Sequence, residues 1–171
     1  MGGCFSFAVH AGSTATFDGV TTVVHSGSVG TWPGTSITGA YKLENGYAYS
    51  ATALAAQCAS DRQSAYNTLS AMTCTTSIST GVLYGLTLTS GVFCSDTGTF
   101  STVGSGILTL DGKYDSTSRW VFLAASTVIT GGYSSVVFVN GGLGKNVYWR
   151  VGSSATIGLS STFVGTILAY A

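Results

Sequence analysis

Ionisable side chains that could act as catalysts or metal ligands are few in this chain of 171 residues, and they stand apart from one another. The carboxylates are scattered singly and are Asp18, Glu44, Asp61, Asp96, Asp111 and Asp115. Two carboxylates can still meet in a folded chain and cleave a glycosidic bond, as in polysaccharide-cleaving β-helices. No GxSxG or HExxH motif accompanies them, however, so almost no residue can be assigned as nucleophile, general acid or base. We expect no enzyme and no cofactor.

The two histidines and one glycine-rich stretch also have structural interpretations. His10 and His25 are expected in adjoining strands, and two histidines without a third ligand make a poor metal site. We therefore interpret them as structural or surface groups and predict no metal. The stretch NGGLGKN at residues 140–146 lacks the GxxxxGK[ST] spacing of a phosphate loop, which favours a turn.

The four cysteines, Cys4, Cys58, Cys74 and Cys94, form no CxxC motif and have no histidine at zinc-ligand spacing. An even number in this arrangement favours disulfides over a metal site, although the sequence alone allows three pairings. Disulfides persist in oxidising surroundings, so we predict a secreted, extracellular protein. Residues 1–9 are too short and lack the basic region of a secretory signal.

Alternating hydroxyl side chains are the remaining pattern with chemical content. In GSSATIG at residues 152–158, strand alternation would turn Ala155 and Ile157 inward and Ser154 and Thr156 outward. The phrase GSTAT at residues 12–16 follows the same template, with Ala15 and Phe17 inward. The predicted outward pairs are Thr14 and Thr16, Thr99 and Ser101, Thr127 and Ile129, and Ser154 and Thr156.

An internal repeat indicates how these strands are positioned. Shifting the chain by 27 residues aligns residues 122–137 with residues 149–164, aromatic on aromatic and Gly131 on Gly158. Such self-similarity is typical of a solenoid. Each unit divides into three short strands separated by Gly or Ser turns, which predicts a triangular β-helix. On stacked strands, outward side chains would form a grid spaced by about 6.7 Å along a strand and about 4.8 Å between strands.

One segment departs from the strand pattern. Ser50–Met72 is rich in Ala and free of Gly and Pro, and we predict a helix over about 50–72. Its expected apolar stripe consists of Leu54, Cys58, Ala65, Leu69 and Met72. That stripe should pack on one side of the solenoid. Thr31–Gly39 holds the only proline and is predicted to be a loop that caps the first coil.

Charge is unusually scarce, which excludes several partners. Only 7% of residues are charged, and six basic residues balance six acidic ones. Nucleic acids and anionic membranes attract clustered Lys and Arg, so we expect neither as a partner. Thr and Ser are common exposed residues of strands, so the alternating hydroxyl pattern by itself indicates no function. The absence of Lys and Glu from that face instead favours a surface that orders water into a lattice.

Several blocks occur in the order found in a known family. FAVHAGSTAT, GSVGTWPGTSITG, the Ala-rich helix, GLTLTSGVFC, WVFLAASTVIT and NVYWRVGSSATIG resemble the microbial ice-binding proteins of the discontinuous β-solenoid type. The similarity extends over nearly the whole chain, from about Phe5 to Ala169. It implies a mainly β protein with a right-handed, irregular, three-faced β-solenoid and one long helix packed alongside.

The resemblance also implies site residues and disulfides. The flat face that adsorbs to ice would include Thr16, Thr99, Ile129 and Thr156, and TSIT at Thr35–Thr38 would join its edge. A cysteine pair seen in some relatives implies Cys74 with Cys94, and Cys4 with Cys58 would then fix the N-terminus to the helix. Relatives usually continue after FVGTILA into a further strand and an NGR-like closing turn, whereas this sequence stops at Ala171.

The sequence therefore predicts a single ice-binding domain over residues 1–171, monomeric, with the surface of an ice crystal as its partner. It would inhibit ice growth and recrystallisation. The alternative is a secreted adhesion or matrix module that binds polysaccharide or a cell surface through the same face. An exposed row of Trp or Tyr on that face would favour the alternative, but Trp120, Tyr148 and Trp149 are predicted on a different strand of the coil.

Overall fold

The computed structural model describes residues 2–170, and for residues 18–21 it describes the backbone alone. The chain divides into two compact units, residues 1–65 (unit 1) and residues 66–171 (unit 2). Both are built from parallel strands, and one helix, α1 (Ala53–Ser70), runs across the division. The expectation of a single domain therefore stays a prediction.

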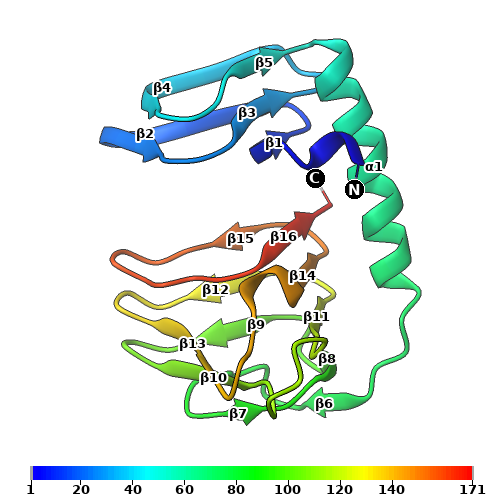
Figure 1. The fold of residues 1–171 in the computed structure, drawn as a ribbon. Coiled ribbons are helices and arrows are strands. Elements are labelled where there is room, and N and C mark those ends of the chain that lie inside the picture. Colours follow the sequence, from blue (N-terminus) through cyan, green and yellow to red (C-terminus); the bar gives the residue numbers. More distant parts are fainter. Residues whose placement is uncertain (1, 171) are drawn as a thin grey trace. The chain divides into compact units, whose positions relative to one another are not determined.

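Unit 2 is a stack of coils that run through three parallel sheets (Figure 1). The first sheet has the order β16-β14-β11-β8-β6, the second β15-β12-β9, and the third β13-β10-β7. The strands are β6 (Thr76–Ile78), β7 (Thr87–Leu88), β8 (Gly91–Ser95), β9 (Phe100–Thr102), β10 (Ile107–Asp111), β11 (Trp120–Ala124), β12 (Val128–Thr130), β13 (Ser135–Val139), β14 (Val147–Val151), β15 (Ala155–Thr156) and β16 (Thr166–Ala169). The predicted mainly β fold with stacked parallel strands is confirmed.

The 27-residue repeat in the sequence corresponds to the strand pairing between neighbouring coils. Phe122 pairs with Trp149 and Val128 pairs with Ala155, both at the predicted shift of 27 residues. Gly152 allows this close stacking, because a Cβ atom there would lie 1.8 Å from the carbonyl oxygen of Ala125. The stretch at residues 140–146 forms the predicted turn, which ends in the short helix η2 (Gly144–Asn146).

The core of unit 2 is a column of aromatic rings. Phe122 stacks on Trp149 with ring centroids 4.0 Å apart and planes 10° from parallel, and Phe93 stacks on its other side at 5.2 Å. The indole Nε1 of Trp149 donates to the carbonyl of Val164 at 3.0 Å, so the buried polar atom is satisfied. Offset and stacked rings stabilise a core beyond the apolar area they bury.

A polar cluster closes the corner after β10. Asp111, which is buried, accepts hydrogen bonds from the backbone N–H of Lys113 and from Nδ2 of Asn140 at 2.9 and 2.8 Å. The Nζ atom of Lys113 lies 2.8 Å from the same carboxylate. Three hydrogen bonds lower the pKa of Asp111 to about 2: those from the side chain and the backbone N–H of Lys113, and that from Asn140. The carboxylate therefore stays ionised and holds the turns of two coils together.

Unit 1 contains two parallel sheets, β1-β3-β5 and β2-β4. Its strands are β1 (Phe7–Ala11), β2 (Thr14–Val24), β3 (Ser28–Thr31), β4 (Ser36–Leu43) and β5 (Ala48–Ser50). The register of β2 with β4 shifts between Phe17 and Thr22, which divides this pair of strands into two segments. Gly39 lies at the break with φ +94°, and a Cβ atom there would lie 1.8 Å from the carbonyl of Phe17.

The predicted loop at residues 31–39 is only partly a loop. Thr31 ends β3 and Ser36 already begins β4, so the irregular part is residues 32–35, around a cis peptide bond between Trp32 and Pro33. The error arose because Pro33 and Gly34 mark a turn, whereas Ser36–Gly39 pair with β2.

The helix begins later and ends earlier than the predicted 50–72. It begins at Ala53 because the side chain of Thr52 accepts the backbone N–H of Ala55 at 3.2 Å, as an N-cap does. The predicted stripe was partly wrong, since Leu54 is 39% exposed. The buried helix residues are Ala55, Cys58, Tyr66 and Leu69, spaced by three, eight and three residues. No helix of the described residues has the length and apolar character needed to cross a membrane.

Arg150 packs the end of the helix against β14 within unit 2. Its guanidinium lies 4.8 Å from the centroid of the Tyr66 ring, and its Nε donates to the hydroxyl of Ser70 at 2.9 Å. Its Nη1 also donates to the carbonyl of Ala124 at 3.1 Å. A cation over an aromatic face with satisfied donors is a favourable contact, so the end of the helix that belongs to unit 2 packs beside the solenoid.

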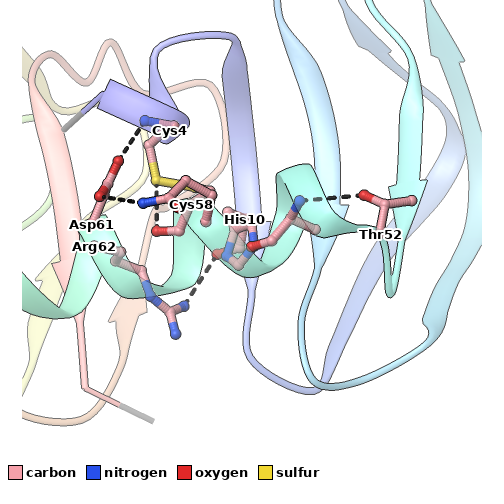
Figure 2. Close-up of a disulfide and its surroundings, with 9 residues drawn as sticks. Cys4, His10, Thr52, Cys58, Asp61 and Arg62 are labelled. Atoms are coloured by element: carbon pink, nitrogen blue, oxygen red, sulfur yellow. Dashed lines mark hydrogen bonds between the residues drawn. A yellow bond between two sulfur atoms is a disulfide. The ribbon is translucent and has the colours of Figure 1, made fainter.

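Two disulfides join Cys4 to Cys58 and Cys74 to Cys94. These are the pairings that the resemblance implied. Figure 2 shows how Cys4 and Cys58 attach the N-terminal 3₁₀ helix η1 (Gly2–Cys4) to α1. Asp61 supports the attachment by accepting the N–H of Gly3 and, at 3.0 Å, the amide of Gln57. Two hydrogen bonds lower the pKa of Asp61. The one from Gly3 has the larger effect and the one from Gln57 the smaller.

His10 is a structural residue of unit 1, as predicted. Its Nε2–H donates to the carbonyl of Ala55 at 2.9 Å, while its Nδ1 is buried without a partner in the described part of the chain (Figure 2). Burial lowers the pKa of His10 from its ordinary 6.5; the bond to Ala55 opposes this, and the charge of Arg62 adds to it. The described residues contain no group of three or more potential metal ligands.

The lowered pKa of His10 predicts a pH-dependent stability. The unfolded chain takes up the proton at a higher pH than the folded chain, so stability is full above pH 6.5 and falls as the pH decreases from there. We expect the melting temperature, followed by circular dichroism, to fall between pH 7.5 and 5.5. His10→Gln should reduce this dependence relative to the wild type. An unchanged slope in His10→Gln would contradict the assignment.

Candidate functional site

The sheet β15-β12-β9 presents two rows of short side chains. One row is Ser101, Ile129 and Thr156, which are directly paired in the register. The other row consists of the residues two positions earlier, namely Thr99, Thr127 and Ser154. Neither strand pair shows a register shift, so the rows run evenly across the sheet. We call these six residues the hydroxyl face of unit 2.

The side chains of the hydroxyl face are exposed or half-buried. Ser154 and Thr156 are exposed, and Ile129 is 45% exposed at the centre of its row. Thr99, Ser101 and Thr127 are half-buried. The hydroxyl oxygens of Thr99 and Thr127 lie 3.0 Å apart and form a hydrogen bond from one coil to the next. That bond aligns two neighbouring side chains before any partner arrives.

The residues between the two rows face the core. Phe100 and Val128 are buried, in agreement with strand alternation. Thr102 and Thr130 are also buried. Their hydroxyl oxygens accept the backbone N–H groups of Gly131 at 3.2 Å and Gly158 at 2.8 Å, one coil further on. These internal hydrogen bonds hold successive coils at a constant distance and support the hydroxyl face from behind.

The hydroxyl face carries no formal charge. Residues 99–102, 127–130 and 154–156 contain no Asp, Glu, Lys or Arg, and their only aromatic residue is the buried Phe100. No titratable group therefore lies in the rows, and the face is the same at any pH near neutral. Trp120, Tyr148 and Trp149 lie in β11 and β14, in a different sheet, as predicted, and both tryptophans are buried.

Sequence reasoning missed one member of the row and placed one neighbour wrongly. Val82 pairs with Ser101 through an isolated bridge and extends the row of Ile129 by one position. The 27-residue repeat does not reach this coil, so only its valine in a β-like stretch could have indicated it.

Ile157 was predicted to point inward but is 41% exposed, because β15 ends at Thr156 and Ile157 lies outside the strand, before the turn at Leu159 and Ser160.

Unit 1 contains a second, smaller set of predicted site residues. Thr14 and Thr16 are exposed on β2, on either side of the buried Ala15. Thr16 lies opposite Thr38 of β4, with their hydroxyl oxygens 3.2 Å apart. Thr35 precedes β4, and the residue opposite Thr14 is Ser36. The pair formed by Thr16 and Thr38 therefore resembles the pair formed by Thr99 and Thr127.

These features define a class: β-solenoid proteins with an uncharged sheet of short side chains in even rows and a long helix. The chain belongs to the Ice-binding-like family, whose profile matches residues 9–171. It is 38% identical over 170 residues to an ice-binding protein of Nostoc sp., an alignment that includes 99% of this chain and 61% of the relative. It is also 36% identical over 89 residues to ice-binding protein 1 of Shewanella frigidimarina, with 52% of this chain and 10% of the relative aligned. The chain thus spans less than two thirds of either curated relative.

Solved structures agree with this assignment. An ice-binding protein from the Antarctic ascomycete Antarctomyces psychrotrophicus superposes with a TM-score of 0.88 at 34% identity, over 98% of this chain and 81% of that one. An ice-binding protein from an Antarctic biological consortium gives 0.85 at 36% identity, over 98% and 75% of the two chains. The three-faced solenoid with its helix is therefore the fold of the family.

Proposed function

We propose that this protein binds ice and so inhibits ice growth and recrystallisation. Its partner is the surface of an ice crystal, and adsorption involves no turnover. The proposal rests on one observation, the unshifted register that sets six uncharged, short side chains in two even rows on the hydroxyl face. The relatives from Nostoc sp. and Antarctomyces psychrotrophicus are ice-binding proteins, which supports it.

The physical basis is preorganisation. Side chains about 6.7 Å apart along a strand and about 4.8 Å apart between strands repeat at intervals that a layer of ordered water can follow. β-Branched Thr and Ile are restricted at χ1, so binding requires little rearrangement. Thr methyl groups would hold clathrate-like water between them while hydroxyl groups bond to it. A charged side chain would impose its own hydration shell and disturb this layer.

Adsorbed molecules act on the ice front by pinning it. Ice can then grow only between neighbouring molecules, and the front curves there. A curved front melts more readily, so the freezing point falls locally and small crystals stop exchanging water with large ones.

The hydroxyl face of unit 2 is the main ice-binding surface in this proposal, with Thr99, Ser101, Thr127, Ile129, Ser154 and Thr156 as its members. In unit 1 we include Thr14, Thr16, Thr35 and Thr38. The even rows support the first set, and the contact between the hydroxyls of Thr16 and Thr38 supports the second. We further propose that the protein is secreted and acts as a monomer; the two disulfides support an extracellular location.

Growth of an ice hemisphere tests the proposal. Ice is grown slowly into a solution of the fluorescently labelled protein, and the protein concentrations in ice and liquid are compared. We expect enrichment in the ice well above that of an unrelated protein of similar mass. Exclusion to the level of that unrelated protein would contradict ice binding.

A further inference from the structure

A pocket with exposed aromatic walls lies in unit 1, away from the strand segments that carry Thr16 and Thr38. Three turns that follow one another at the same corner form it, at residues 5–6, 26–28 and 44–47. Its volume is about 760 Å³, within the range of small-molecule sites. The lining includes Phe5, Tyr47 and Tyr49 together with Glu44, Asn45 and several serines.

The turns hold one another in place by backbone and side-chain hydrogen bonds. Gly27 N–H donates to the carbonyl of Asn45 at 3.0 Å, and Ser28 N–H donates to that of Ser6 at 2.7 Å. The Nδ2 of Asn45 donates to the carbonyl of His25 at 2.9 Å. The three turns around the pocket are thus held in place before any ligand enters, which lowers the cost of binding.

Two aromatic rings of the pocket are open to solvent without contributing to a core. Phe5 is 95% exposed and Tyr47 is 72% exposed. Tyr47 contacts Tyr49 edge to face at 6.3 Å, and Tyr49 contacts Phe7 at 5.6 Å, so this wall is fixed. A cluster of exposed apolar rings beside polar groups is a common mark of a binding site.

The polar groups of the pocket suit a neutral ligand. Glu44 accepts hydrogen bonds from His25 at 2.7 Å and Lys42 at 3.4 Å, and these bonds lower its pKa. The carboxylate is therefore ionised, but Lys42 offsets its charge. Each oxygen of a carboxylate can accept more than one hydrogen bond, and the amide oxygen of Asn45 is an additional acceptor. Acceptors without net charge match hydroxyl groups better than they match an ion.

We propose that this pocket binds a neutral pyranose unit of an oligosaccharide or polysaccharide. One face of a pyranose ring presents C–H bonds that stack on the negative face of an aromatic ring, here Tyr47 or Phe5. The hydroxyl groups at the rim of the sugar then donate to Glu44 and Asn45. A quaternary ammonium ion fits less well, because it requires a closed aromatic cage and an uncompensated negative charge. This inference is independent of the hydroxyl face and of ice binding.

Saturation-transfer NMR on the whole protein tests the pocket. The probes are four neutral hexaoses, cellohexaose, xylohexaose, mannohexaose and maltohexaose, with choline as the cationic comparison. We expect transfer to the ring C–H protons of at least one hexaose, with a Kd on the order of 1 mM or lower. Transfer to none of the hexaoses, or to choline alone, would overturn the proposal.

Variants locate the binding. Of Tyr47→Ala and Phe5→Ala, the variant that removes the stacking ring should weaken binding by about tenfold, the effect of losing one stacking surface. Phe5 is almost fully exposed, so its removal leaves the fold intact even if Tyr47→Ala does not. The matched control is Tyr133→Ala, an exposed tyrosine of unit 2, which should bind as the wild type does. Equal binding by Phe5→Ala, Tyr47→Ala and the control would refute the site, while ice incorporation should stay unchanged in all three.

Discussion

Thr156→Tyr is expected to lower the freezing hysteresis and the incorporation into ice, because it should weaken adsorption by about tenfold or more, a loss of about 1.4 kcal/mol in binding. Thr156 is exposed at the end of the row that includes Ile129 and Ser101. A tyrosine ring there would project beyond the neighbouring side chains and keep ordered water from fitting over the row. Hysteresis measured by nanolitre osmometry and hemisphere growth give the two readouts.

The matched control is Thr87→Tyr. Thr87 is an exposed threonine of β7, in the third sheet of unit 2. It should retain full activity, and circular dichroism should show both variants folded. Full activity in Thr156→Tyr combined with a loss in Thr87→Tyr would assign ice binding to the other sheet. Ile129→Lys provides a second check, because a charge at the centre of the row should disturb ordered water as much as a bulky ring does.

Trp149→Ala is expected to cost about 3–5 kcal/mol of the free energy of unfolding, the usual range for removing a large buried aromatic side chain. Trp149 is almost fully buried and stacks on Phe122 at 4.0 Å. The variant also leaves the carbonyl of Val164 without its indole donor. Chemical denaturation at neutral pH measures the change.

Trp32→Ala serves as the control for this loss. Trp32 lies in the irregular segment of unit 1 and is partly exposed, so its removal should cost clearly less than that of Trp149. A smaller loss in Trp149→Ala than in Trp32→Ala would mean that the aromatic column does not stabilise unit 2 in the way described.

The register and the alternation of unit 2 could be predicted because they are repeated in the sequence. A shift of 27 residues places Phe122 on Trp149 and Val128 on Ala155, as the strand pairing does. The coil with Val82 could not be recognised, because its length differs and its residues do not match the repeat. Repetition is informative only where neighbouring coils have equal length.

Residue type alone did not determine exposure. Thr102 and Thr130 have the same hydroxyl as Thr99 and Thr127, yet they are buried and bond to the backbone of the next coil. In the helix, Leu54 is 39% exposed although the neighbouring Ala55 is fully buried, so its hydrophobicity did not determine its position. The pocket at Tyr47 was not predicted, since three turns from separate parts of the sequence form it.

The stacking of coils in unit 2 also indicates how such a protein can change in length. Each middle coil pairs only with the coil before it and the coil after it, through parallel strands in unshifted register. In an array with nearest-neighbour pairing, a whole coil is a module that can be duplicated or lost without redesign of the others. A tandem duplication of residues 126–152 would lengthen the sheet by about 4.8 Å and add one side chain to each of the two rows, so genetic duplication offers a direct route to larger surfaces.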